Sequence, residues 1–458
     1  MAMAHEEQRA GAPTSSPPPR LRVLDTTLVP PSPSGSPPPE CSLPLTIYDT
    51  FWLPFPPVER LFLYRLTPDA DVQAILSNLK LALSRAIHAF YPLAGRIRLT
   101  PGTSDRYELH YRPGDGVTFT VAEYGGGLAT DDPRAIAPLV PALPAGGAAV
   151  LALQATLLPP HRCGLAVGVA VNHAAVDGSA STHFLHSWAA AAAACAHTNS
   201  PPAPVIDRSL LPVALFQPMP TINKMEFDMP ARQLLATFTL SREDIQRVKH
   251  AVAAEAARRG VAPPPRCTSL VSTLGFVWSC HHRATTTPGA STDGDGRTCL
   301  LFSIDHRSRM SPPLPDKYLG NCVGPALAVA PKAALAAGDL LSACAAVTAA
   351  IDEAVSGVRT ASMGAWTDRL REVAAAMSML PVAGSPRFRV YEMDLGFGRP
   401  EKVDIVSVAR TGALALAESR RGDGGMEVGV PLPPDDMARF RTCFADAIAG
   451  LHARRDMS

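Results

Sequence analysis

The stretch Val171-Asn172-His173-Ala174-Ala175-Val176-Asp177-Gly178 joins two elements that the sequence itself predicts. The apolar run 163–171 is too short for an isolated helix and follows two prolines, which predicts a buried strand. The Ala-rich segment to about residue 196 predicts a helix, with Ser179 or Ser181 as its N-cap. His173 is therefore expected between the end of a strand and the start of a helix, where α/β proteins commonly place their chemistry.

The residue types in this stretch suit proton transfer from an alcohol. A neutral imidazole can accept a proton near pH 7. Asp177 follows past a turn that Gly178 permits, so its carboxylate can orient the ring or pair with an arginine. Two other interpretations stay open, a buried histidine with a satisfied hydrogen bond and a metal ligand. Zinc would need further ligands, and the adjacent His281 and His282 point in different directions on a predicted helix, so we expect no metal site.

Four motifs of this sequence, in their order along the chain, resemble those of the plant BAHD acyltransferases. These are CoA-dependent enzymes that acylate alcohols and amines. The stretch from His173 to Gly178 is similar to their HxxxDG signature. The other matches are YPLAGR at 91–96, DHRSR at 305–309 with YLGNC at 318–322, and DLGFGRP at 394–400. The resemblance runs from about residue 23 to 451. A segment like YLGNC is typical of the branch that acylates flavonoid and anthocyanin glycosides, often from malonyl-CoA.

The late block departs from the family pattern at two positions. Leu395 and Phe397 stand where the family usually has Phe and Trp. Phenylalanine keeps an aromatic face but lacks the indole N–H donor. In the family this block lies away from the reacting atoms and is structural. The resemblance thus implies a structural role for four residues and retained activity: Asp394, Gly396, Phe397 and Gly398.

The resemblance implies an α/β fold of two chloramphenicol-acetyltransferase-like domains, with mixed β-sheets flanked by helices and a channel between them. The mixture of strands, hairpins and helices independently predicts mixed sheets. The hydrophobic pattern predicts strands over 61–66 and 388–393. It also predicts one long helix over 333–358 and another helix over 366–379. The expected divisions are a disordered Pro/Ser-rich N-terminus at 1–20, an N-terminal domain with HxxxDG at 21–197, a Pro-rich crossover linker at 198–225 and a C-terminal domain with DLGFG at 226–458.

The family mechanism implies a role for each of the central residues. His173 would act as the general base in the channel, without an acyl-enzyme. Asp177 would turn away from the channel and hold the loop through an arginine, for which Arg307 is the matching position and Arg309 the second choice. Ser385 is a candidate donor to the oxyanion.

A CoA site needs helix N-termini, hydroxyls and cations for the phosphates and the pantetheine arm. Thr268 and Ser269 open a predicted helix, and Lys249 lies on the preceding one. An ordinary helix cap and a solvated lysine are the competing interpretation. A malonyl carboxylate would also need a cation or a helix N-terminus, and residues 179–182 carry no charge. The donor therefore stays open between malonyl-CoA, which is favoured, and a hydroxycinnamoyl-CoA.

Composition limits the remaining classes. The 458-residue chain has a net charge of +1 and no basic stripe, which argues against a nucleic-acid partner. Its nine scattered cysteines, with no signal peptide or membrane anchor in sight, predict a cytoplasmic protein with free thiols, and the family expectation is a monomer. The expected partners are an acyl-CoA co-substrate and a small hydroxyl acceptor, with no permanent cofactor and no membrane. A condensation domain would need a second histidine at Asn172, and a catalytically silent CoA-fold binding protein is the non-enzyme alternative.

Overall fold

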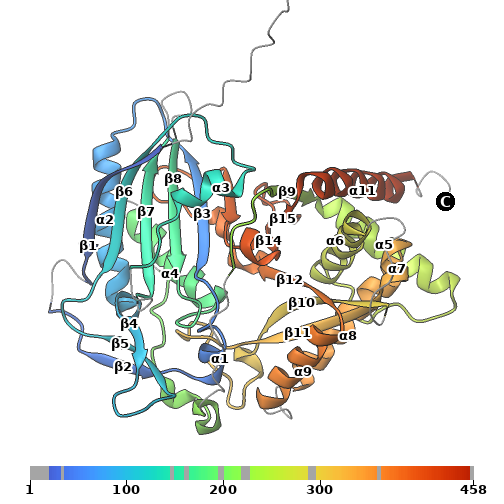
Figure 1. Cartoon of the computed structure of the whole chain (residues 1–458), viewed down its shortest axis with the longest axis horizontal. Coiled ribbons are helices and arrows are strands. Elements are labelled where there is room, and N and C mark those ends of the chain that lie inside the picture. The colour runs from blue at the N-terminus through green and yellow to red at the C-terminus, as the bar shows by residue number, and fades with distance from the viewer. Residues whose placement is uncertain are drawn as a thin grey trace, which may run out of the picture.

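A computed structural model describes residues 20–31, 36–144, 149–158, 164–193, 201–217, 227–286, 296–357 and 363–453. Within these ranges the strands form two six-stranded sheets and one three-stranded sheet. Figure 1 shows the two large sheets side by side, each with its own helices. Both contain parallel and antiparallel pairs, so the predicted two-domain α/β fold with mixed sheets is confirmed.

The first large sheet carries the strand that leads to His173. It has the order β1-β6-β7-β8-β3-β13, and of these pairs β6 and β7 run parallel. Apolar residues of β8 alternate between a core under helices α2 and α4 and a second core on the opposite face. The elements are β1 (Arg20–Val29), β6 (Val117–Gly125), β7 (Leu151–Leu157), β8 (Gly164–Val171), β3 (Val58–Arg65), β13 (Lys402–Ile405), α2 (Val72–Ala89) and α4 (Gly178–Ala192).

The second large sheet has the order β11-β10-β12-β14-β15-β9. Helices α5, α6, α8 and α11 pack on it and share one apolar core with its strands. By length and composition alone α8 could cross a membrane, but it packs on α6 and β11 in this core. The elements are β9 (Leu234–Leu240), β10 (Arg297–Asp305), β11 (Val323–Pro331), β12 (Ser378–Gly384), β14 (Leu414–Glu418), β15 (Met426–Leu432), α5 (Arg242–Arg258), α6 (Ser269–Thr285), α8 (Leu340–Gly357), α9 (Met363–Ala376) and α11 (Pro434–Ala453).

Short elements complete the fold around these sheets. The three-stranded sheet has the order β2-β5-β4. Helix α1 lies between the two large sheets in Figure 1, and the aromatic residues Phe51, Trp52 and Phe55 follow it directly in the chain. The remaining elements are β2 (Cys41–Pro44), β4 (Arg96–Leu99), β5 (Tyr107–Tyr111), α1 (Ile47–Thr50), α3 (Pro133–Ile136), α7 (Lys332–Ala336) and α10 (Val408–Thr411).

One strand of the first sheet comes from the far end of the chain. Strand β13 pairs antiparallel with β3, so Asp404 stands opposite Leu61. The segment before it also belongs to the first core, to which it contributes Val390, Tyr391, Met393 and Leu395. The late block is thus in the second half of the sequence but packs with the first sheet.

Several local predictions were wrong or lie outside the described residues. Residues 388–393 form two 3₁₀ turns rather than a strand, because Arg389 has a left-handed backbone with φ of 51°. The single helix predicted over 333–358 is two helices, α7 and α8, separated at Gly338 with φ of +72°. Helix α9 ends at Ala376, and the unpredicted strand β12 follows. Residues 1–19, 198–200 and 218–225, which hold most of the predicted disordered N-terminus and much of the linker, lie outside the described ranges.

Gly168→Ala should destabilise the strand that positions His173. Gly168 lies in the middle of β8, where an added Cβ would collide with the backbone of Leu139. Overpacking of this kind typically costs about 1–3 kcal/mol of unfolding free energy. Denaturant unfolding of the variant measures this loss. Gly127→Ala is the control, since nothing lies within 4 Å of its added Cβ, and an equal loss in both variants would contradict the explanation.

Candidate active site

The loop that carries His173 is shaped by its neighbours on both sides. Strand β8 ends at Val171, and the Asn172 side chain accepts a hydrogen bond from the Ala174 N–H at 3.0 Å. Helix α4 then begins at Gly178 with Asp177 as its N-cap, which accepts from the Ala180 N–H at 3.0 Å. The predicted serine caps were wrong, because the Asp177 carboxylate lies nearer the first free N–H groups.

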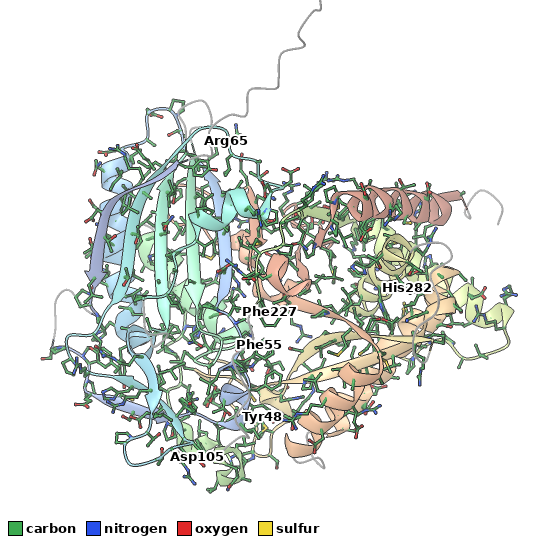
Figure 2. The ribbon with its side chains drawn as sticks, in the orientation of Figure 1. Tyr48, Phe55, Arg65, Asp105, Phe227 and His282 are labelled. Atoms are coloured by element: carbon green, nitrogen blue, oxygen red, sulfur yellow. The ribbon has the colours of Figure 1, made fainter. Side chains whose placement is uncertain are left out.

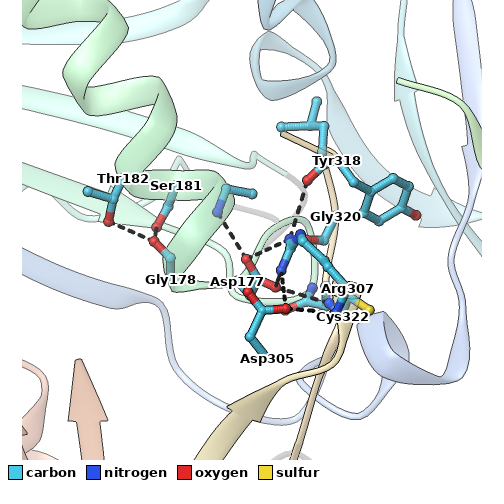
Figure 3. Close-up of polar contacts among 12 residues, drawn as sticks. Asp177, Gly178, Ser181, Thr182, Asp305, Arg307, Tyr318, Gly320 and Cys322 are labelled. Atoms are coloured by element: carbon cyan, nitrogen blue, oxygen red, sulfur yellow. Dashed lines mark hydrogen bonds and ion pairs between the residues drawn. The ribbon is translucent and has the colours of Figure 1, made fainter. Parts of the chain in front are cut away.

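Asp177 and Arg307 form a buried bidentate ion pair (Figure 3). The two guanidinium N–H groups donate to the two carboxylate oxygens at 2.8 and 3.0 Å. The Cys322 N–H donates to the same carboxylate at 3.0 Å. Arg307 also donates to the carbonyls of Tyr318 and Gly320, at 3.2 and 3.0 Å. The pair therefore ties the HxxxDG loop to the DHRSR and YLGNC segments.

The charge of this pair is fully balanced. Burial alone would raise the pKa of Asp177, but the charge and hydrogen bonds of Arg307 hold that pKa below its ordinary value of 3.8. A lowered folded-state pKa means that the pair stabilises the fold above this pH and that the stabilisation is lost on stronger acidification. Arg309, the second choice for this role, instead donates to the backbone carbonyl of Asp305.

The His173 ring lies against an aromatic side chain that the motifs did not indicate. Trp52 stacks on the imidazole with ring centroids 3.7 Å apart and an interplanar angle of 13°. Burial lowers the pKa of His173 below its ordinary value of 6.5, and the charge of Arg60 acts in the same direction. Asp177 and Asn321 oppose that shift. The half-buried ring is thus neutral at pH 7, as a general base must be.

The backbone of His173 is held by Asn321, which is held in turn by a second buried carboxylate, Asp49. The Asn321 amide donates to the His173 carbonyl and to Asp49, each at 2.9 Å. Asp49 is fully buried, and its other oxygen accepts from Thr46 at the start of α1. Arg208 lies 3.8 Å from the same carboxylate. The YLGNC segment therefore contacts both ends of the HxxxD motif.

Aromatic rings gather beside the imidazole where the two sheets meet. Phe51 and Phe55 pack on Trp52 with centroid distances of 5.0 and 5.5 Å, and Phe227 stacks on Phe55 at 6.1 Å. Figure 2 shows Phe55 and Phe227 between the two halves of the molecule, with Tyr48 below them. The cluster offers an aromatic surface, made of rings tilted against one another, next to His173. The aromatic stretch Phe51-Trp52-Leu53-Pro54-Phe55 was the available sequence signal.

The late block lies at the far end of α4 from His173. Its Asp394 carboxylate accepts from the N–H groups of Gly396 and Gly398 at 2.9 and 3.0 Å. A Cβ on Gly396 would stand 3.1 Å from the Ala192 carbonyl, in the last turn of α4. Phe397 packs edge-on against Tyr64 at 5.1 Å. The structural role implied for this block fits these contacts.

Ser385 makes a local contact instead of one with the imidazole. Its hydroxyl caps a 3₁₀ turn by accepting from the Arg387 N–H at 3.3 Å. The oxyanion role proposed for it stays a prediction.

The three residues predicted to bind CoA lie together. Thr268 is the N-cap of α6 and accepts from the Val271 N–H at 3.3 Å, and Lys249 on α5 donates to the Ser269 hydroxyl at 3.2 Å. A cation, two hydroxyls and a helix N-terminus thus meet at one point, although a simple cap explains Thr268 equally well. In the part of the chain that the structure describes, no group of three or more His, Cys, Asp or Glu residues could hold a metal ion.

Comparison with known proteins adds to this geometry. A family model described as the Transferase family matches residues 21–446. The chain is 31% identical to phenolic glucoside malonyltransferase 1 of Arabidopsis thaliana over 91% of this chain and 95% of the relative. It is 28% identical to coumaroyl-CoA:anthocyanidin 3-O-glucoside-6''-O-coumaroyltransferase 1 of the same plant, with 93% and 97% covered. The fold matches the crystal structure of vinorine synthase with a TM-score of 0.70 at 20% identity, covering 92% of this chain and 96% of that one.

Asp177→Asn should lower the unfolding free energy by about 3–5 kcal/mol, because it leaves the Arg307 charge buried without a counter-charge. Denaturant unfolding measures the change. Asp305→Asn is the matched control, since Asp305 contacts the same guanidinium at 3.3 Å but its side chain is 45% exposed. Exposed pairs contribute about 1 kcal/mol or less. Equal losses in both variants would show that burial of the pair is not what matters.

Proposed function

Because this chain belongs to the Transferase family of BAHD acyltransferases, it is an acyltransferase, and we propose that it moves a malonyl group from malonyl-CoA to a hydroxyl of a phenolic or flavonoid glycoside. The observation that carries the proposal is the His173 imidazole, which is neutral, half-buried and held at the junction of β8 and α4. The malonyl donor and the glucoside acceptor are those for which two relatives, 31% and 30% identical to this chain, are named.

In the proposed reaction His173 removes the proton from the acceptor hydroxyl as its oxygen attacks the thioester carbonyl. A tetrahedral oxyanion forms and collapses, the C–S bond breaks, and the imidazolium returns the proton to the departing CoA thiolate. Both substrates are bound at once, so no acyl-enzyme is required. Their positioning can supply several kcal/mol of the barrier reduction.

In this scheme Asp177 does not take part in proton transfer itself. Its two oxygens are occupied by Arg307 and by backbone N–H groups, so the carboxylate is not free to accept a proton. It is a positioning residue that fixes the loop on which His173 stands. The aromatic surface of Phe51, Trp52 and Phe55 suits the ring of a phenolic acceptor.

The donor would bind from the side of the second sheet. Lys249 suits a phosphate of CoA, with Thr268 and Ser269 at the N-terminus of α6. A hydroxycinnamoyl-CoA is the second candidate donor, since the coumaroyltransferase relative is also similar over nearly the whole chain.

His173→Ala should lower kcat by about 10²- to 10⁴-fold, the usual contribution of a general base. Steady-state assays with malonyl-CoA and a phenolic glucoside measure the effect. His88→Ala is the control, because that histidine is exposed on α2. Near-normal turnover by the His173 variant would remove the base role.

The pH dependence of kcat/KM is a second test of His173 as the general base. Burial lowers the pKa of His173 from 6.5, so the neutral base persists below pH 6.5. The wild-type kcat/KM should therefore hold steady down to that pH and fall on further acidification. An acid limb lying above pH 6.5 would contradict a buried imidazole as the base.

The donor is tested by assaying the wild-type protein with malonyl-, acetyl- and p-coumaroyl-CoA against one flavonoid glucoside and one phenolic glucoside. We expect the highest kcat/KM with malonyl-CoA, because relatives at 30–32% identity are named as malonyltransferases. Preference for p-coumaroyl-CoA would replace the proposed donor with the second candidate. Release of CoA only when an acceptor is present separates transfer from simple hydrolysis.

A further inference from the structure

Arg60 on strand β3 is a buried cation that forms no ion pair with any residue the structure describes. Its side chain is 6% exposed, and its guanidinium donates to the Thr182 hydroxyl at 2.9 Å. Among the described residues it takes part in no ion pair, in contrast to the buried Arg307. A guanidinium has five N–H donors, and burying its charge unpaired costs several kcal/mol. An arrangement of this kind points to a partner that the chain itself does not provide.

The guanidinium lies beside the positive end of helix α4. Thr182, its hydrogen-bond partner, is within the second turn and donates in turn to the carbonyl of Gly178, the first helical residue. The Phe388 ring stacks on the guanidinium at 5.5 Å and also closes against Gly178, where an added Cβ would collide with it. A cation next to a helix N-terminus is unfavourable unless an anion joins them.

Three acidic side chains lie near Arg60, and in the described part of the chain none of them forms an ion pair with it. Glu418 is the carboxylate whose charge acts on Arg60, but its Oε1 accepts from the Tyr391 N–H at 2.7 Å and it makes no ion pair with the guanidinium in the described structure. Asp404 and Glu427 line a small cavity together with Arg60, and Asp404 pairs with Lys402 while Glu427 pairs with Arg420. Burial lowers the pKa of Arg60 to about 10, so the guanidinium keeps its charge at pH 7.

We propose that Arg60 binds the free carboxylate of the malonyl group and so determines the choice of donor. The inference rests on the proposed function, since it takes His173 as the centre at which acyl transfer occurs. Arg60 donates to Thr182 in the second turn of α4, the helix that begins five residues after His173 in the chain. The charge of Arg60 also lowers the pKa of His173. A planar guanidinium can hold a carboxylate through two parallel hydrogen bonds, while acetyl and coumaroyl groups offer it no charge. Arg60 thus supplies the cation that residues 179–182 lack.

The test compares Arg60→Gln and Arg60→Lys with wild type for malonyl-CoA and acetyl-CoA. Both the Kd of each donor, by calorimetry, and kcat/KM with one acceptor are measured. Arg60→Gln should weaken malonyl-CoA by about 10- to 100-fold, the usual size of a charged hydrogen bond, and acetyl-CoA by far less. Arg60→Lys keeps the charge and should recover part of the loss. Arg65→Gln, on the same strand but 73% exposed, is the control and should alter neither donor.

The outcomes separate this inference from the proposed function. If wild type uses malonyl-CoA and Arg60→Gln weakens both donors equally, Arg60 is a structural cation and the inference fails while the proposed function stands. If wild type binds acetyl-CoA or p-coumaroyl-CoA in preference to malonyl-CoA, the proposed donor fails and the inference fails with it. Thermal unfolding of each variant shows whether a loss comes from misfolding, and the Kd ratio of the two donors stays informative for any variant that folds.

Discussion

The buried pair of Asp177 and Arg307 is the constraint on which the site depends. Each side chain alone would be an unbalanced charge in a low-dielectric interior, so the three segments that supply and surround the pair must assemble together. The carboxylate also caps α4 and receives the Cys322 N–H. One ion pair thereby fixes the start of a helix, the end of a strand and the loop between them. The imidazole of His173 inherits its position from that assembly.

The charges around His173 also set the protonation state of its imidazole. A base needs a neutral ring at working pH, and burial together with Arg60 favours that state. Asp177 would favour the protonated ring, but Arg307 largely cancels its charge. A histidine and an aspartate four residues apart therefore do not act as a simple charge pair. Their separation of roles comes from the arginine that stands behind the aspartate.

The parts of the site that lie in signature segments could be predicted from the sequence, including the pairing of Asp177 with Arg307. Trp52 and Arg60, which lie far upstream of the HxxxDG motif, were missed. Arg60 reaches α4 only because β3 pairs with β8 so that Arg60 stands opposite Val169. The strand was predicted from Leu61, which left the charged residue outside it. Strand β12 was missed because its first two residues were taken into the helix predicted over 366–379 and because it contains Pro381. Such features depend on strand register and tertiary packing, which the local hydrophobic pattern of the sequence does not reveal.

Because β13 comes from the second half of the sequence, the first sheet cannot be completed early in the synthesis of the chain. Strand β3 would be the edge of the first sheet without the pairing partner supplied by residues 402–405. While a ribosome is still making the chain, that edge is bare and its N–H and C=O groups are open to other strands. The half that carries the imidazole thus cannot finish folding until most of the polypeptide has emerged. An isolated fragment ending before residue 402 would present the same open edge and would be prone to self-association.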